Sequence, residues 1–135
     1  MRTRKGFTSE SGASAVEFAL LLPLLMMLVF GIVEFGFALY RQAVLTNASR
    51  EGARVGIVQA IPPITTAQIN AAIDNYLTPA GINPANVSRS IIAGGATGSP
   101  VRVTLTLPYQ FVVLPGLTSV AQQINLTAWT EMRHE

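Results

Sequence analysis

The chain has 135 residues, of which half are apolar and 12% are charged, and its net charge is +2. This is the length of one small domain. The charge excess lies in residues 1–12, which hold Arg2, Arg4, Lys5 and Glu10, while acidic and basic residues balance from residue 13 onward. The sequence therefore offers no basic face for a nucleic acid. Because it has no cysteine, disulfides and thiolate metal sites are excluded.

An apolar block begins at Phe18 and continues without a charge to Val33, over sixteen residues. Extended back to Ala13, the block has 21 residues and is interrupted only by Glu17. As a helix it would be about 31 Å long, close to the roughly 30 Å of a bilayer core. We therefore expect a transmembrane helix. A buried core helix is the alternative, but the remaining hundred or so residues could hardly wrap a helix that is apolar on every side.

The direction of the segment follows from its flanks. Arg2, Arg4 and Lys5 precede it, and positive charge stays on the cytoplasmic side. We expect a cytoplasmic N-terminus, a single pass through the inner membrane, and an extracytoplasmic C-terminal part. A secretory signal would place small residues after its apolar region. Here the small residues 12–15 come before it, and the bulky sequence EFGFALYRQAV follows.

Residues 12–18 read Gly-Ala-Ser-Ala-Val-Glu-Phe and resemble the processing site of type IV prepilins. The resemblance implies that a membrane peptidase cuts between Gly12 and Ala13. Glu17 then becomes the fifth residue of the mature chain, followed by the aromatic Phe18. A glycine lets the backbone approach a protease cleft closely. A carboxylate in an apolar helix needs a partner, which in a filament could be the new amino group of a neighbouring subunit. In the uncut protein, Glu17 could equally lie at headgroup depth.

Residues 34–58 read EFGFALYRQAVLTNASREGARVGIV, and this stretch resembles the TadE-like family of Tad (Flp-type) pilus systems. Glu34 and Arg41 are seven apart and share a helix face. This face could be solvated just outside the membrane, which is the interpretation we favour for Arg50. For Glu51 and Arg54, contact with the outer domain or with a partner is equally open. The residues of the family motif outside the membrane are Glu34, Arg41, Arg50, Glu51, Gly52 and Arg54.

The outer part combines one helix with alternating strands. Pro62-Pro63 should end the long helix, and Thr66 should cap a second helix with Ile69, Ile73 and Leu77 on one stripe, stopped by Thr78-Pro79 and Gly81. Strands are expected at 87–91, 101–107 and 124–129, with a glycine-rich turn at 94–100 and a loop containing Pro108, Pro115 and Gly116.

The predicted fold is a pilin-like α+β arrangement, in which a long N-terminal transmembrane helix is followed by a short helix and a small antiparallel sheet. The predicted organisation is a basic prepilin-type leader at 1–12, a transmembrane and juxtamembrane helix at 13–58, and an extracytoplasmic domain at 59–135.

The sequence argues against an enzyme. His134 is the single histidine and lies next to the C-terminus, and glycine-rich residues 94–98 lack the lysine of a phosphate-binding loop. We expect no cofactor, metal, nucleic acid or small-molecule substrate. The resemblance implies a minor pilin or pseudopilin, which serves the structure or assembly of a pilus used in adhesion, biofilm formation or secretion. Its partners would be the bilayer, a prepilin peptidase, and other pilins or platform proteins. The alternative is a membrane-anchored binding module that never polymerises.

Overall fold

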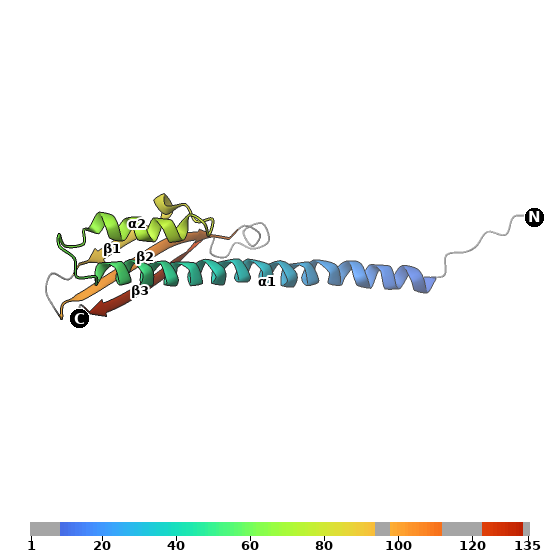
Figure 1. Ribbon diagram of the computed structural model, residues 1–135. Coiled ribbons are helices and arrows are strands. Elements are labelled where there is room, and N and C mark those ends of the chain that lie inside the picture. The colour runs from blue at the N-terminus through green and yellow to red at the C-terminus, as the bar shows by residue number, and fades with distance from the viewer. Residues whose placement is uncertain (1–8, 94–97, 112–122, 134–135) are drawn as a thin grey trace, which may run out of the picture.

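The computed structural model describes residues 9–93, 98–111 and 123–133, which form a long helix that carries a small α+β domain on its C-terminal half (Figure 1). This confirms the predicted fold class. In chain order the elements are α1 (Ser9–Gly56), α2 (Thr66–Leu77), the short 3-10 helix η1 (Pro84–Asn86), β1 (Ser88–Ile92), β2 (Pro100–Gln110) and β3 (Gln123–Arg133).

The two halves of α1 have different surroundings. Its N-terminal half projects from the domain with its apolar side chains exposed, and by length and composition the helix can cross a membrane. Its C-terminal half buries Leu45, Ala48 and Ala53 in the domain core. The helix begins at Ser9, ahead of Gly12, and ends at Gly56, before the predicted boundary at residue 58 and well before Pro62-Pro63.

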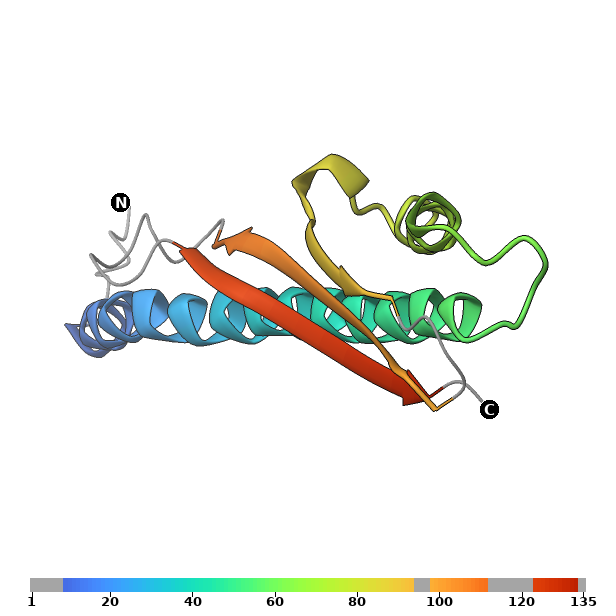
Figure 2. The same ribbon diagram turned by 90° about the vertical axis from the view of Figure 1, so that its left-hand side faces the viewer.

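The sheet is antiparallel with the order β1-β2-β3, and β2 and β3 cross α1 obliquely (Figure 2). β2 alternates as the sequence predicts, so that Val101, Val103, Leu105 and Leu107 are buried. Two polar contacts tie β3 to the helix. The buried Ser49 hydroxyl lies 2.7 Å from Thr130 Oγ1, and Gln42 Nε2 donates to the Thr127 carbonyl at 2.9 Å.

Pro108 was expected in a loop, and this prediction is wrong because β2 continues through Pro108 to Gln110. The pairing explains why a proline is tolerated there. β1 pairs with β2 only as far as Thr106, so that beyond this point β3 is the one described strand that pairs with β2. A residue without an N–H fits an edge of this kind. The strand therefore brings one more inward-facing residue, Tyr109, to the helix.

The second helix starts as a capping box, but its cap is Thr65 and not the predicted Thr66. The Gln68 N–H donates to Thr65 Oγ1, and the Thr65 N–H donates to Gln68 Oε1 at 2.8 Å. Such a box needs Gln or Glu three residues after the cap, and this spacing selects Thr65. The predicted stripe is confirmed, since Ile69, Ile73 and Leu77 are fully buried.

Arg89 on β1 holds the sheet to α2. Its guanidinium donates to Asp74 Oδ1 at 2.5 Å, to Asn70 Oδ1 at 3.3 Å and to the Pro84 carbonyl at 3.1 Å. β1 itself is shifted one residue from the predicted 87–91. The leader residues 1–8, the turn residues 94–97, Pro115, Gly116 and His134 lie outside the described residues.

Candidate functional site

Three side chains from two elements meet where the exposed half of α1 enters the domain. Glu34 is only 3% exposed, and the Tyr109 hydroxyl donates to its Oε1 at 2.7 Å. Arg41, two turns along the helix, places its guanidinium carbon 5.3 Å from the centre of the Tyr109 ring, within the range of a cation–π contact. The shared face of Glu34 and Arg41 therefore packs on the sheet, and a solvated face is wrong for Glu34.

Tyr109 is protonated in this arrangement. Burial, above all, and then the hydrogen bond and charge of Glu34 raise its pKa to about 12, while the nearby Arg41 acts in the opposite direction. Phe111 packs edge-on against the Tyr109 ring, with centroids 5.4 Å apart. Sequence reasoning missed Tyr109 because it ended the strand at Pro108. The alternation of residues 101, 103, 105 and 107 would have reached 109 had it been followed through the proline.

The residues of the predicted cleavage site lie apart from this cluster. Gly12, Ala13, Glu17 and Phe18 all lie on the exposed half of α1, with exposed side chains at Ala13, Glu17 and Phe18. A Cβ at Gly12 would meet no atom within 4 Å among the described residues. The fold therefore places no packing demand on a glycine at this position.

In the second half of the motif, Glu51 and Arg54 pair with each other. Arg54 Nε lies 2.9 Å from Glu51 Oε2, and Arg54 Nη2 lies 2.5 Å from Glu51 Oε1. This hydrogen bond holds the pKa of Glu51 below, and that of Arg54 above, its ordinary value. Arg50 is exposed, as favoured. An exposed pair adds little to stability, so partner contact of Glu51 or Arg54 stays a prediction.

Gly52 has a packing role that the sequence did not reveal. A Cβ on Gly52 would lie 2.8 Å from Cγ1 and 2.9 Å from Cδ1 of the fully buried Ile73. The absence of a side chain therefore lets α2 approach α1 closely. Gly56, one turn later, is similarly tight, with Val101 Cγ1 2.8 Å from the position of its Cβ.

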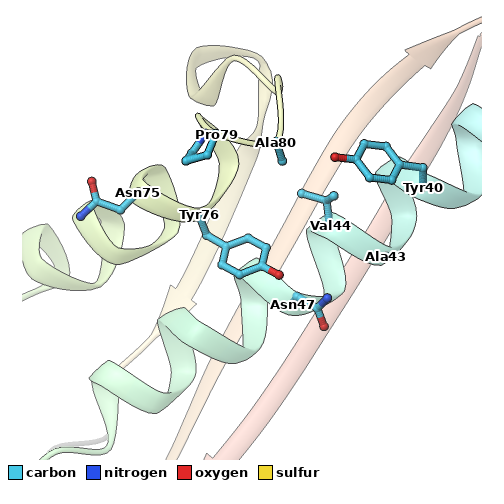
Figure 3. Close-up of a pocket in the computed structure, with 8 residues that line it drawn as sticks. All are labelled: Tyr40, Ala43, Val44, Asn47, Asn75, Tyr76, Pro79 and Ala80. Atoms are coloured by element: carbon cyan, nitrogen blue, oxygen red, sulfur yellow. The ribbon is translucent and has the colours of Figure 1, made fainter.

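A groove of about 490 Å³ separates α1 from the C-terminal end of α2 (Figure 3). Tyrosine and asparagine from both sides line it together with small apolar residues, and none of its lining residues is charged. The lining consists of Tyr40, Ala43, Val44, Asn47, Asn75, Tyr76, Pro79 and Ala80. Among the described residues no group of three or more His, Asp or Glu side chains could hold a metal ion.

An exposed apolar helix that continues into the core of one small domain defines a class, the single-pass membrane proteins with an N-terminal anchor. Within it, the family model of the TadE-like proteins matches residues 12–54. The predicted resemblance to this family is therefore confirmed for residues 12–54. The match begins at Gly12 and ends at Arg54, so every predicted site residue lies inside it. No curated protein and no solved structure matches the chain.

Proposed function

We propose that this protein is a minor pilin or pseudopilin, a structural or assembly component of a Tad-type pilus. The observation that carries the proposal is the TadE-like match, which coincides with the membrane-competent helix from Gly12 onward. Adhesion, biofilm formation and secretion are the processes such a pilus would serve. The protein would act by binding other pilus proteins and not by catalysis.

Maturation would begin with a cut between Gly12 and Ala13 by a prepilin peptidase. This bond lies in the first turns of α1, where the leading N–H groups have no intrahelical acceptor. Opening one or two turns at a helix end is inexpensive compared with opening the packed C-terminal half. The peptidase could therefore extend the backbone around Gly12 without disturbing the outer domain.

The orientation follows from Arg2, Arg4 and Lys5, which would keep the N-terminus in the cytoplasm. The α+β domain would then stand outside the inner membrane, and after processing it would be carried into the pilus or to the cell surface. Val58 is exposed beyond the end of α1 and offers a test. In spheroplasts, a Val58→Cys variant should react with an impermeant thiol reagent, and labelling only after lysis would contradict the orientation.

Glu17 would act during assembly. Its side chain is exposed at the start of the apolar segment, and after cleavage it would be the fifth residue from a new amino group. A carboxylate gains little in a lone subunit that water or headgroups solvate. Beside the amino group of a neighbouring subunit, in a low-dielectric surrounding, the same charge interacts far more strongly.

A non-polymerising binding module is the second candidate, and the groove between α1 and α2 favours it. This groove has no charged lining residue and opens beside Tyr40, close to the exposed apolar half of α1 (Figure 3). A module of this kind would hold a partner near the membrane. It would keep its leader and remain in the membrane fraction.

The deciding experiment compares wild type with Glu17→Gln in cells that express the cognate peptidase and pilus genes. Immunoblots of membranes and of sheared surface material report cleavage and incorporation together. For a pilin, wild type is cut and reaches the sheared fraction, whereas Glu17→Gln is cut but incorporated less. An uncut wild type confined to membranes supports the binding module. Equal incorporation of the two would refute the assembly role of Glu17.

A further inference from the structure

The charge-free run of α1 is too short to cross a bilayer by itself. Phe18 to Val33 as a helix measures about 24 Å, against roughly 30 Å for the hydrocarbon core. The bilayer must take in residues beyond one end of this run. Extension toward the N-terminus passes Glu17, and extension toward the domain passes Glu34. The two choices place the membrane midplane at different residues.

The structure treats these two glutamates differently. Glu17 has an exposed side chain on the projecting half of α1. Glu34 is covered by the sheet, and its Oε1 accepts the Tyr109 hydroxyl. A bare carboxylate in hydrocarbon is costly, whereas one that protein covers and hydrogen-bonds is tolerated. The membrane-spanning segment of α1 therefore extends past Glu34 at lower cost than past Glu17.

The helix surface beyond Glu34 agrees with this direction. Phe35 and Phe37 are 63% and 59% exposed, and Leu39 and Tyr40 are also exposed, before the first cation at Arg41. From Phe18 to Phe37 there are twenty residues, or about 30 Å of helix, which matches the core of a bilayer. Tyr40 and Arg41 then fall in the headgroup layer, where tyrosine and basic side chains are favoured.

The distribution of charge on the sheet independently supports the same position of α1 in the bilayer. On β2 and β3 the charged residues Arg102, Glu131 and Arg133 lie at the end far from Glu34, near the C-terminal end of α1. Arg89 of β1, the other charged residue of the described strands, stands opposite Leu105 and is paired with Asp74 of α2, and β1 does not reach beyond Thr106. The described residues of the near half, 103–111 on β2 and 123–130 on β3, contain no charged side chain. This half ends in Phe111 and the partly exposed Ile124.

We propose that the membrane span of α1 is Phe18–Phe37 and that the charge-free end of the sheet, with Tyr109, Phe111 and Ile124, enters the outer part of the bilayer to the depth of Glu34 and contacts lipid. The folded domain is thus seated in the bilayer surface and does not stand above it on a linker. This inference rests on the membrane anchoring in the proposed function. It places Glu17 at the cytoplasmic headgroups and makes the phospholipid bilayer a direct partner of the outer domain.

Fluorescence quenching in vesicles of brominated phosphatidylcholine tests the register. The full chain has one tryptophan, and a Trp129→Phe background allows single probes. Leu20→Trp and Ile32→Trp form a matched pair at exposed positions of α1. For a span of 18–37 they lie about 11 Å and 7 Å from the midplane, but for a span of 13–33 about 4.5 Å and 13.5 Å.

Lipids brominated late in the acyl chain should therefore quench Ile32→Trp more strongly than Leu20→Trp. Equal or reversed quenching overturns the proposed span. Lipids brominated early in the chain should quench Phe37→Trp and Ile124→Trp, whereas Val58→Trp, at the far end of α1, should be quenched by neither lipid. An unquenched Ile124→Trp overturns the seating of the domain, and an unquenched Phe37→Trp overturns the extension of the span to Phe37.

Flotation of the same vesicles distinguishes a failure of the membrane anchor from an error in the residues assigned to the span. Wild-type protein that fails to float with vesicles contradicts the membrane anchor, and with it the proposed function. Protein that floats but shows the reversed quenching order contradicts the register alone.

Discussion

The Tyr109 hydroxyl donates a 2.7 Å hydrogen bond to Glu34 although 75 positions separate these residues in the chain. One residue comes from the last inward-facing position of β2 and the other from the middle of α1. Their contact therefore fixes where along the helix the outer domain ends. It also gives a buried carboxylate a donor close to the apolar segment.

Tyr109→Phe should destabilise the outer domain. The change removes the hydroxyl and keeps the ring, so Glu34 Oε1 loses this donor while packing is preserved. The loss of a hydrogen bond to a buried charged group costs about 1–3 kcal/mol. Unfolding of the protein in detergent, followed by the fluorescence of Trp129, measures the loss. Tyr76→Phe, at an exposed tyrosine of α2, is the control, and an equal effect of both changes would show that the Glu34 contact is not stabilising.

Alkaline pH should weaken the domain through the same residue. The folded-state pKa of Tyr109 is about 12, above the ordinary value of 10.0 that applies to the unfolded chain. The stabilisation is thus fully present below pH 10 and is lost as the pH rises toward 12, because only the unfolded state readily releases this proton. Melting temperatures across this interval should fall less steeply for Tyr109→Phe than for wild type. Parallel curves would show that another group controls the alkaline transition.

Gly52→Ala should destabilise the contact between α1 and α2. The added methyl group would overlap the buried Ile73, and such overpacking costs about 1–3 kcal/mol, against the roughly 1 kcal/mol that alanine gains over glycine in a helix. Ile73→Val removes Cδ1, one of the two clashing atoms. The cost of Gly52→Ala should therefore be smaller in an Ile73→Val background, as measured by a double-mutant cycle from denaturant unfolding. Strict additivity would mean that Gly52 is not needed for this close approach.

Arg89→Lys should cost more than Arg102→Lys. Arg89 is largely buried and reaches three acceptors on α2 and η1 with its planar guanidinium, which a lysine cannot reproduce. Arg102 pairs with Glu131 on an exposed part of the sheet, where such a pair contributes about 0–1 kcal/mol. We expect a loss of about 1–3 kcal/mol for Arg89→Lys on thermal unfolding. Equal losses for the two variants would show that the contacts of Arg89 do not stabilise the packing of α2 on the sheet.

Gly12→Val should block leader removal without altering the fold. No described atom lies within 4 Å of a Cβ at this position, so any effect on cleavage reflects the peptidase and not the packing of the chain. Intact-mass analysis of protein made beside its peptidase should show an uncut chain. Ala15→Val adds comparable bulk after the bond and should still be cut. A mature N-terminus at Ala13 in Gly12→Val would rule out glycine recognition.

The sequence predicted those parts of the fold that depend on neighbouring residues. The stripe of Ile69, Ile73 and Leu77 and the alternation of Val101 to Leu107 are local periodicities, and both sets are buried. The cap of α2 was misplaced by one residue because two threonines adjoin, and only the capping box distinguishes Thr65. Pro108 was interpreted as a strand end because its local signal is that of a breaker, whereas the limited pairing of β1 makes it tolerable.

Contacts between distant segments were beyond such reasoning. Helical spacing placed Glu34 and Arg41 on one face, but nothing local says that Tyr109 covers this face. Gly52 was likewise identified as a motif residue, but the sequence did not show why a glycine is needed there. The cause is the close approach of Ile73, which lies on another helix. The role of Gly12 and Glu17 depends on molecules outside the chain and stays a prediction.

One continuous helix of 48 residues serves as anchor and as part of the domain core. It is about 72 Å long, and it runs without a break from its apolar half to the contacts of Leu45, Ala48 and Ala53 with the core. A tilt or rotation of the anchor is therefore passed to the outer domain through the helix itself. A force that draws the anchor out of the bilayer is likewise transmitted along the helix axis directly to the sheet, so extraction loads the core in shear.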